Sequence, residues 1–137
     1  MFLSGEGAAV LLPAAGSAGG PALLRLRVTG ADPAAPLSGE RPLPGVVNSF
    51  GGNDPARWRT GIPTFGAVRA RGVLPGVDVL WYGREGRIEH DFILAPGVEA
   101  GAVSFRLEGA ATLSLDGMTG DLVADLPGGA AFRLHAP

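Results

Sequence analysis

Apolar and polar residues alternate along much of the chain in short segments that are separated by glycine- and proline-rich turns. In residues 22–28, every second position is apolar, at Leu24, Leu26 and Val28, and arginines stand between them. This period of two, with one apolar and one wet face, is typical of an antiparallel strand. No window of useful length shows a helical period.

The same alternation predicts further strands, with turn residues about every ten positions. We expect strands near residues 1–4, 8–12, 22–28, 46–50, 62–71, 77–82, 87–94, 103–107, 113–115, 122–126 and 131–134. This spacing predicts an all-β fold, either an antiparallel β-sandwich or an open barrel, with short strands and long Pro/Gly-rich loops.

Turns and loops follow from the small residues and prolines between these segments. Residues 5–7, 72–76, 83–86, 116–120 and 127–129 read as turns, with Gly19-Gly20 a further turn signal in a small-residue loop over 13–21. Four prolines within residues 30–45 argue against a helix or an inner strand there, so we expect a surface loop. Asp54 is placed to cap a single helical turn over residues 55–58.

The chain length of 137 residues suits one domain over residues 1–137. The net charge of −2 provides no basic field for nucleic acid, and all eleven basic residues are arginine. The absence of cysteine excludes disulfides, thiolate zinc sites and thiol nucleophiles.

Targeting signals are equally sparse. No apolar run is long enough for a membrane-spanning helix. The first residues lack a basic segment, and Glu6 interrupts their apolar run, so they do not read as a signal peptide. Either the protein stays inside the cell or its true N-terminus lies further upstream.

Five polar residues supply oxygen atoms for metal binding or acid–base chemistry: Asn53, Asp54, Asp78, Glu89 and Asp91. The loop that holds Asn53 and Asp54 lacks the alternating acids of a calcium loop, so an Asx turn or helix cap is favoured there. For Asp78, within an apolar strand, we expect a structural ion pair with Arg59 or Arg71.

Glu89 and Asp91 lie two residues apart on one face of a predicted strand. Paired carboxylates of this kind serve in glycoside hydrolysis. Cross-strand pairing with arginine, at Arg69, Arg71 or Arg84, is the favoured interpretation. No catalytic residue, metal site or cofactor is therefore predicted.

Three aromatic residues, Trp58, Trp81 and Tyr82, offer ring surfaces for sugar binding. In a chain with few aromatics, packing in the core is favoured over that role. His90 alternates with Ile88 and Phe92, so it is expected to be a packed core histidine.

The central stretch resembles an uncharacterised domain that precedes β-propeller-type (SBBP) repeats in large bacterial surface or secreted proteins. The resemblance spans about residues 24–134 and is carried by Val47-Asn48, Phe50, Gly52-Asn53-Asp54-Pro55, Trp58-Arg59-Thr60, Ile62-Pro63-Thr64, Val68, Gly72-Val73, Pro75-Gly76-Val77-Asp78-Val79, Tyr82-Gly83, Glu89, Asp91-Phe92, Ala95-Pro96-Gly97, Leu107-Glu108-Gly109-Ala110 and Gly120-Asp121-Leu122. It implies an extracellular or cell-surface location.

The pattern and the resemblance together favour a non-catalytic module for adhesion, assembly or scaffolding. Its expected partners are neighbouring repeat or β-propeller domains, or surface glycans and proteins. The alternatives are a carbohydrate-binding module and, less favoured, a fragment of a glycan hydrolase. The residues expected to contact a ligand are Asn53, Asp54, Trp58, Arg59, Asp78, Trp81 and Tyr82.

Overall fold

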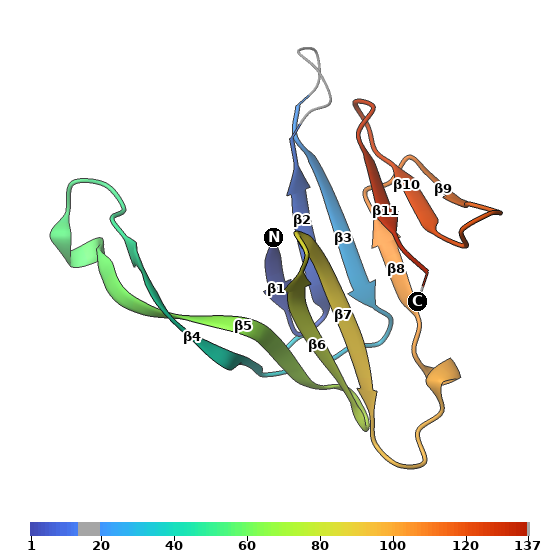
Figure 1. Cartoon of the computed structure of the whole chain (residues 1–137), viewed down its shortest axis with the longest axis horizontal. Coiled ribbons are helices and arrows are strands. Elements are labelled where there is room, and N and C mark those ends of the chain that lie inside the picture. The colour runs from blue at the N-terminus through green and yellow to red at the C-terminus, as the bar shows by residue number, and fades with distance from the viewer. Residues whose placement is uncertain (14–19, 137) are drawn as a thin grey trace. The chain divides into compact units, whose positions relative to one another are not determined.

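The computed structural model of the chain describes residues 1–13 and 20–136, which form mainly antiparallel strands (Figure 1). The strands make three sheets, none closed into a barrel, so the predicted all-β class is confirmed and fits a β-sandwich. Most of the expected loop at residues 13–21, with Gly19, lies outside the described residues. The contacts divide the chain into two compact units, unit 1 (Met1–Pro33 and Ala100–Pro137) and unit 2 (Ala34–Glu99).

Unit 1 contains a four-stranded sheet in the order β1-β2-β3-β8. Its strands are β1 (Phe2–Ser4), β2 (Gly7–Leu12), β3 (Ala22–Val28) and β8 (Phe105–Glu108), and the short 3₁₀ turn η2 (Ala100–Ala102) precedes β8. Ser4 pairs with Gly7, which confirms the predicted first hairpin. Gly7 has a φ of +144°, and a Cβ there would press on the Leu26 carbonyl oxygen, so this position requires glycine.

The second sheet of unit 1 consists of β9 (Thr112–Leu115), β10 (Leu122–Asp125) and β11 (Ala131–Leu134), in the order β11-β10-β9. Leu24 of β3 is buried together with Ala124 and Leu126. Partly buried apolar side chains pack around these three: Leu12, Ala22, Leu107, Ala110, Ala130 and Phe132. The two sheets therefore share one apolar core, as the layers of a sandwich do.

Unit 2 contains the third sheet, β4-β5-β6-β7, in chain order. Its strands are β4 (Leu37–Ser49), β5 (Arg59–Leu74), β6 (Val77–Arg84) and β7 (Arg87–Leu94), and the 3₁₀ turn η1 (Pro55–Arg57) joins β4 to β5. The loop expected over residues 30–45 is thus wrong in its second half. A strand tolerates Pro42 and Pro44 because β4 lies at the sheet edge, where a missing N–H breaks no inner ladder.

The strands of unit 2 show the predicted alternation. On β6, Val77, Val79 and Trp81 are buried, and Asp78 and Tyr82 project to the opposite face. The β6–β7 ladder is regular throughout, from Val77 opposite Leu94 to Arg84 opposite Arg87. Leu80 is also buried although it lies on the polar side of the strand, so the alternation is strict for side-chain direction and looser for burial.

Candidate functional site

The end of the β4–β5 hairpin forms a two-stranded ribbon, residues 41–66, that we call the arm. Pairing of β5 with β6 begins only at Ala67, so the preceding residues of β5 pair with β4 alone. The ribbon extends past β6 and β7 in Figure 1. Every residue from 41 to 61 is exposed to solvent.

The arm carries large apolar side chains in spite of this exposure. The exposed fraction is 61% for Phe50, 42% for Trp58 and 62% for Val46, and Leu43 and Val47 are exposed to a similar extent. Exposed apolar side chains that lie in contact often mark a binding region, and Phe50 and Trp58 are in contact at the tip of the arm.

The tip of the arm is braced by three hydrogen bonds. Asp54 accepts a bond from the Ala56 N–H at 3.0 Å, which confirms the predicted cap of a helical turn. The Trp58 Nε1–H donates to the Gly52 carbonyl at 3.1 Å, and Asn48 Oδ1 accepts from the Gly61 N–H at 2.8 Å. These bonds fix the tip before any ligand arrives, which lowers the ordering cost of binding.

Phe50 and Trp58 form an aromatic pair on this braced tip. Their ring centroids lie 5.3 Å apart with the planes at 90°, the edge-to-face geometry that aromatic pairs prefer. Trp58 was expected to fill the core, and that expectation is wrong. Trp58 lies between η1 and β5 at the tip of the arm, where every residue is exposed, so no inner layer exists to receive the ring.

Two more of the expected ligand-contacting residues, Asn53 and Arg59, lie on this segment. Asn53 is exposed in the turn before η1. Arg59 begins β5 opposite Ser49, on the arm. Arg59 is therefore not the partner of Asp78, which lies on β6.

Asp78 finds its partners in its own sheet. It lies 3.3 Å from Arg69 Nη1 and accepts a 2.7 Å bond from the Gly72 N–H. Arg71, the other expected partner, instead lies 3.4 Å from Glu40. The predicted structural ion pair exists, but its arginine is Arg69, which β5 places one strand away from Asp78 on the same face.

Arg69 also lies 2.8 Å from Glu40 through its Nε atom, although this contact lacks the alignment of a hydrogen bond. Glu40, Arg69 and Asp78 thus form a charged row across β4, β5 and β6. Partly exposed ion pairs of this kind contribute little to stability. They do occupy the Asp78 carboxylate, which bonds within its own sheet.

Asp91 is bonded to tyrosine and not to arginine. The Tyr82 hydroxyl donates to Asp91 Oδ1 at 3.2 Å, so the arginine partner expected for Asp91 is wrong. Burial, followed by the bond to Asp91, raises the pKa of Tyr82 above its ordinary value. The Arg41 guanidinium lies over the Tyr82 ring, with its central carbon 5.5 Å from the ring centroid. The backbone of Arg41 has a φ of +56°, a conformation that is uncommon outside glycine.

Trp81 and His90 lie on the other face of this sheet. Trp81 is buried, which agrees with its expected core role, and His90 stacks on it with ring centroids 5.0 Å apart. Phe92 meets the histidine edge-on at 5.5 Å. His90 is half-buried, so the prediction of a packed histidine is confirmed, and Trp81 is removed from any exposed sugar platform.

Burial lowers the pKa of His90 from its ordinary value of 6.5, with Asp91 opposing the shift. The fold therefore favours the neutral ring, and the unfolded chain binds the proton more readily. We expect the contribution of His90 to stability to be full above pH 6.5 and to fall as the pH drops below that value. Urea unfolding at pH 7.5 and at pH 5.5 measures this change.

His90→Phe is the control for that experiment, because it keeps an aromatic ring and removes the titration. Its stability should change less between the two pH values than that of the unmodified protein. Acidic groups with low pKa values titrate well below this window. An equal pH dependence in both proteins would contradict the assignment to His90.

A polar cluster in unit 1 was missed by the sequence analysis. Asp121 is buried, and it accepts from the Ala136 N–H at 3.0 Å and lies 3.1 Å from both Arg133 and His135. The bond from Ala136 is the largest cause that lowers the pKa of Asp121 to about 2, with Arg133 helping and burial opposing. Arg133 also reaches Asp116 at 3.1 Å, so one guanidinium joins two carboxylates and ties β11 to the β9–β10 turn.

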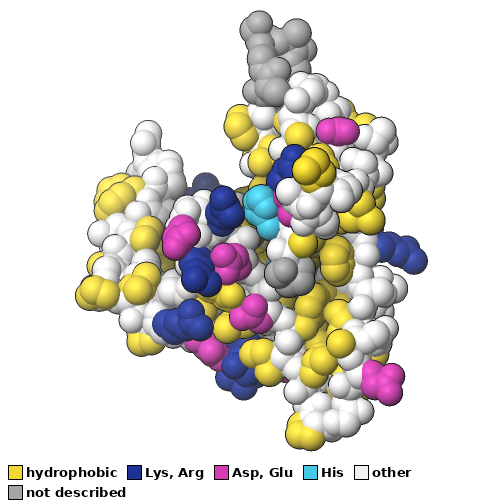
Figure 2. Space-filling view, turned by 45° about the vertical axis from the view of Figure 1, so that its right-hand side comes forward, with side chains coloured by type: hydrophobic (Ala, Val, Ile, Leu, Met, Phe, Trp, Pro, Cys, Tyr) yellow, Lys and Arg dark blue, Asp and Glu magenta, His cyan; other side chains and the backbone are white. Residues whose placement is uncertain are grey.

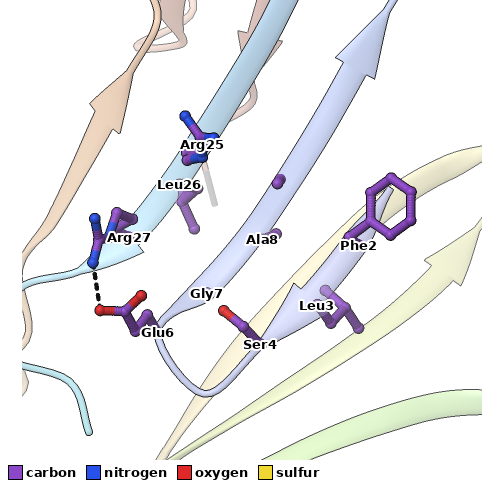
Figure 3. Close-up of a pocket in the computed structure, with 10 residues that line it drawn as sticks. Phe2, Leu3, Ser4, Glu6, Gly7, Ala8, Arg25, Leu26 and Arg27 are labelled. Carbon is purple, nitrogen blue, oxygen red and sulfur yellow. Dashed lines mark hydrogen bonds and ion pairs between the residues drawn. The ribbon is translucent and has the colours of Figure 1, made fainter. Parts of the chain in front are cut away.

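Unit 1 also has a shallow hollow, of about 170 Å³, between β1, β2 and β3 (Figure 3). Glu6 and Arg27 form an ion pair at its rim, and Phe2 and Leu26 add apolar surface. None of the carboxylates weighed for hydrolysis, Asp78, Glu89 and Asp91, lines this hollow.

Charge and metal-ligand groupings add no further site. Figure 2 shows acidic and basic side chains interspersed on the displayed face. Within residues 1–13 and 20–136, no three His, Cys, Asp or Glu side chains gather as a metal ion would require. No helix among the described residues is long and apolar enough to cross a membrane.

Residues 17–137 match a family described as a domain of unknown function, DUF7948. No curated protein and no solved structure matches the chain.

Proposed function

The chain belongs to the DUF7948 family of domains of unknown function, and we propose that it is a non-catalytic interaction module that binds through the tip of its arm. One observation carries this proposal. Trp58 is held by a hydrogen bond from its indole N–H to the Gly52 carbonyl, and Phe50 packs edge-on against it, yet the two side chains are 42% and 61% exposed. Rigid exposed aromatic side chains are the usual anchors of binding surfaces.

We further propose that the module works outside a bacterial cell, in adhesion, assembly or scaffolding beside repeat domains. The support is the resemblance of the central stretch to the domain that precedes SBBP repeats. The partners of this proposal are neighbouring repeat or β-propeller-type domains, or surface proteins. Protease treatment of intact cells tests the location, because a surface module is cleaved and an internal one is protected.

A catalytic role has weaker support. Asp78 is engaged by Arg69 and by the Gly72 N–H, and Asp91 accepts from Tyr82. A hydrolase needs one carboxylate free to protonate a leaving group and another free to attack or to activate water. Hydrolysis of glycans by the chain, lost in both Asp78→Asn and Glu89→Gln, would favour the hydrolase alternative.

Carbohydrate binding is the second candidate function, and the exposure of Trp58 favours it. The indole ring stands beside Asn53, Asp54 and Arg59 in the sequence, which could hydrogen-bond to hydroxyl groups. Glycan-array binding that depends on Trp58 would support this candidate.

The double substitution Phe50→Ala/Trp58→Ala tests the interaction module directly. We expect cells that express the full-length double variant to hold much less of it at their surface than cells that express the unmodified protein, because the exposed anchors are removed. Neither side chain belongs to a buried core, so the double variant should keep its strands, which circular dichroism checks. The matched control is Leu115→Ala, which removes a 73% exposed side chain from unit 1. Equal retention of the double variant and the control would contradict the proposal.

A further inference from the structure

β7 forms an open and regular edge of the unit 2 sheet. It pairs with β6 along its whole length, and no further strand pairs with it among the described residues. Its ladder has no register shift, its sequence has neither proline nor glycine, and none of its residues is buried. The opposite edge strand, β4, is interrupted by Pro42, Pro44 and two register shifts. Prolines and irregularities protect an edge from pairing, so β7 is the edge of this sheet that can accept a strand.

The hydrogen bonds of the sheet determine which backbone groups of β7 point outward. The Ala95 N–H donates to the Gly76 carbonyl at 2.8 Å, one position beyond the end of the β6–β7 ladder. Hydrogen-bonded pairs recur at every second position of an antiparallel ladder, so the odd-numbered residues of β7 bond to β6. The even-numbered residues point their N–H and C=O groups to the open edge: Ile88, His90, Phe92 and Leu94. None of these groups has a backbone partner within residues 1–13 and 20–136.

Two carboxylates on β7 give an added strand a charge preference. Glu89 and Asp91 lie on one face of the strand, and neither forms an ion pair with a described residue. Asp91 accepts from Tyr82 through Oδ1, which leaves Oδ2 for a further partner. A residue directly opposite on an added strand has its Cβ about 4.5–5.5 Å away. Arginine or lysine opposite Glu89 and Asp91 would therefore meet both carboxylates.

The residues that alternate with these carboxylates require apolar partners. A residue between the two basic positions of the added strand lies opposite His90, and the next residues on the same face lie opposite Ile88 and Phe92. These three side chains share the face that holds the buried Trp81. Apolar residues at these positions would extend that face by one strand. The matching segment thus alternates apolar and basic residues.

A second copy of β7 does not match this edge. Two-fold antiparallel pairing sets one residue of the strand opposite itself. A centre at Glu89 or Asp91 sets that carboxylate against its own copy, and a centre at His90 sets Glu89 against Asp91. Like charges directly opposite each other destabilise a sheet. Centres nearer either end leave part of β7 unpaired.

We propose that β7 binds an extended segment of another polypeptide, with alternating apolar and basic residues, as a further antiparallel strand of the unit 2 sheet. Main-chain hydrogen bonds to the open edge provide the affinity, and the carboxylates of Glu89 and Asp91 select the basic residues. This second binding surface goes beyond the proposed function, because it does not use the tip of the arm.

A short peptide with the core Val-Arg-Val-Arg-Val, blocked at both ends and labelled with a fluorophore, tests this pairing. Its anisotropy should rise to saturation as the 137-residue chain is added, with a Kd of about 1–100 μM. A peptide with glutamate in place of both arginines should bind about tenfold more weakly, because it sets like charges opposite Glu89 and Asp91. Equal binding of the two peptides would overturn the charge selection, and the absence of binding by either would overturn the site.

N-methylated peptides separate strand addition from charge attraction and leave the protein unchanged. In the proposed pairing, the valine N–H groups of the peptide point to β7 and the arginine N–H groups point away. Methylation of the valine nitrogens should abolish binding, and methylation of the arginine nitrogens should preserve it. The same affinity for both methylated peptides would contradict the addition of an antiparallel strand.

Charge variants of the protein provide the reciprocal test. Glu89→Gln/Asp91→Asn should weaken binding of the arginine peptide about threefold or more, because two cross-strand ion pairs are lost. The matched control is Glu85→Gln/Glu99→Gln, which removes two negative charges outside β7 and should leave the Kd unchanged. Circular dichroism checks that both variants retain their strands. An equal Kd for the two variants would argue against the role of the carboxylates and overturn the proposal.

Two further variants distinguish this site from other surfaces. Phe50→Ala/Trp58→Ala should bind the peptide with an unchanged Kd, so a failure at β7 leaves the proposal for the arm standing, and the reverse also holds. Ile88→Pro should weaken peptide binding, because it removes an outward N–H and no bond to β6. If sedimentation velocity shows a dimer of the unmodified chain that Ile88→Pro abolishes, a second copy occupies the edge and the proposed partner is wrong.

Discussion

Replacement of Leu24 by alanine is expected to lower the free energy of unfolding by about 2–5 kcal/mol. Leu24 is 2% exposed and lies with Ala124 and Leu126 in the core shared by the two sheets of unit 1. Truncation there removes apolar contacts and leaves a cavity that the surrounding strands can fill only in part. Urea unfolding, followed by circular dichroism, measures the loss.

Leu115→Ala is the matched control for this experiment. It makes the same chemical change in the same unit, at a side chain that is 73% exposed. Its effect should lie within about 0.5 kcal/mol of zero. Equal losses at the two positions would mean that Leu24 is not a core residue.

Replacement of Trp81 by alanine is expected to lower the free energy of unfolding by about 3–5 kcal/mol. Trp81 is 5% exposed and stacks on His90, so its removal leaves a large cavity and frees the imidazole. The imidazole proton signals of His90 should also move in the NMR spectrum, because they lose the ring current of the indole. The same unfolding measurement reports the stability.

Trp81→Phe distinguishes ring packing from hydrogen bonding at this position. The indole Nε1–H of Trp81 is buried and has no hydrogen-bond partner among the described residues. Phenylalanine keeps an aromatic ring, and no hydrogen bond is lost with the indole. The loss of unfolding free energy in Trp81→Phe should therefore be clearly smaller than in Trp81→Ala. A loss as large as that of Trp81→Ala would indicate that the indole nitrogen is engaged after all.

Local sequence patterns predicted the parts of the fold that depend on local geometry. The alternation of Leu24, Leu26 and Val28 gave the buried face of β3, because a strand presents every second residue to the same side. Asp54 was correctly expected to cap a helical turn, since a cap needs only the residues that follow it.

Features that depend on distant parts of the chain were not predicted. The first half of β4 was missed because its prolines imitate a loop, and only its position at the edge of a sheet makes them acceptable. The choice of Arg69 over Arg59 or Arg71 for Asp78 follows from the β5–β6 register. Trp58 and Trp81 have the same side chain, so their opposite exposures come from their surroundings: Trp58 lies at the exposed tip of the arm, and Trp81 lies on β6, an inner strand of its sheet.

The same limit applies to Asp121. Its bonds to Arg133, His135 and the Ala136 N–H join residues that are 12 to 15 positions apart. No short motif marks such a cluster, because β11 must first return alongside β10 for the carboxylate to meet its donors.

The strand pair β3–β8 gives the chain an order of assembly during synthesis. Val28 pairs with Phe105, and the whole of unit 2 lies between them in the sequence. A ribosome therefore releases the continuous unit 2 in full before the last strand of the first sheet can close onto β3. Unit 2 can then fold while the edge of β3 is still unpaired. Pairing of β8 with β3 must close a long loop that contains all of unit 2, so we expect unit 1 to be completed later and more slowly than unit 2.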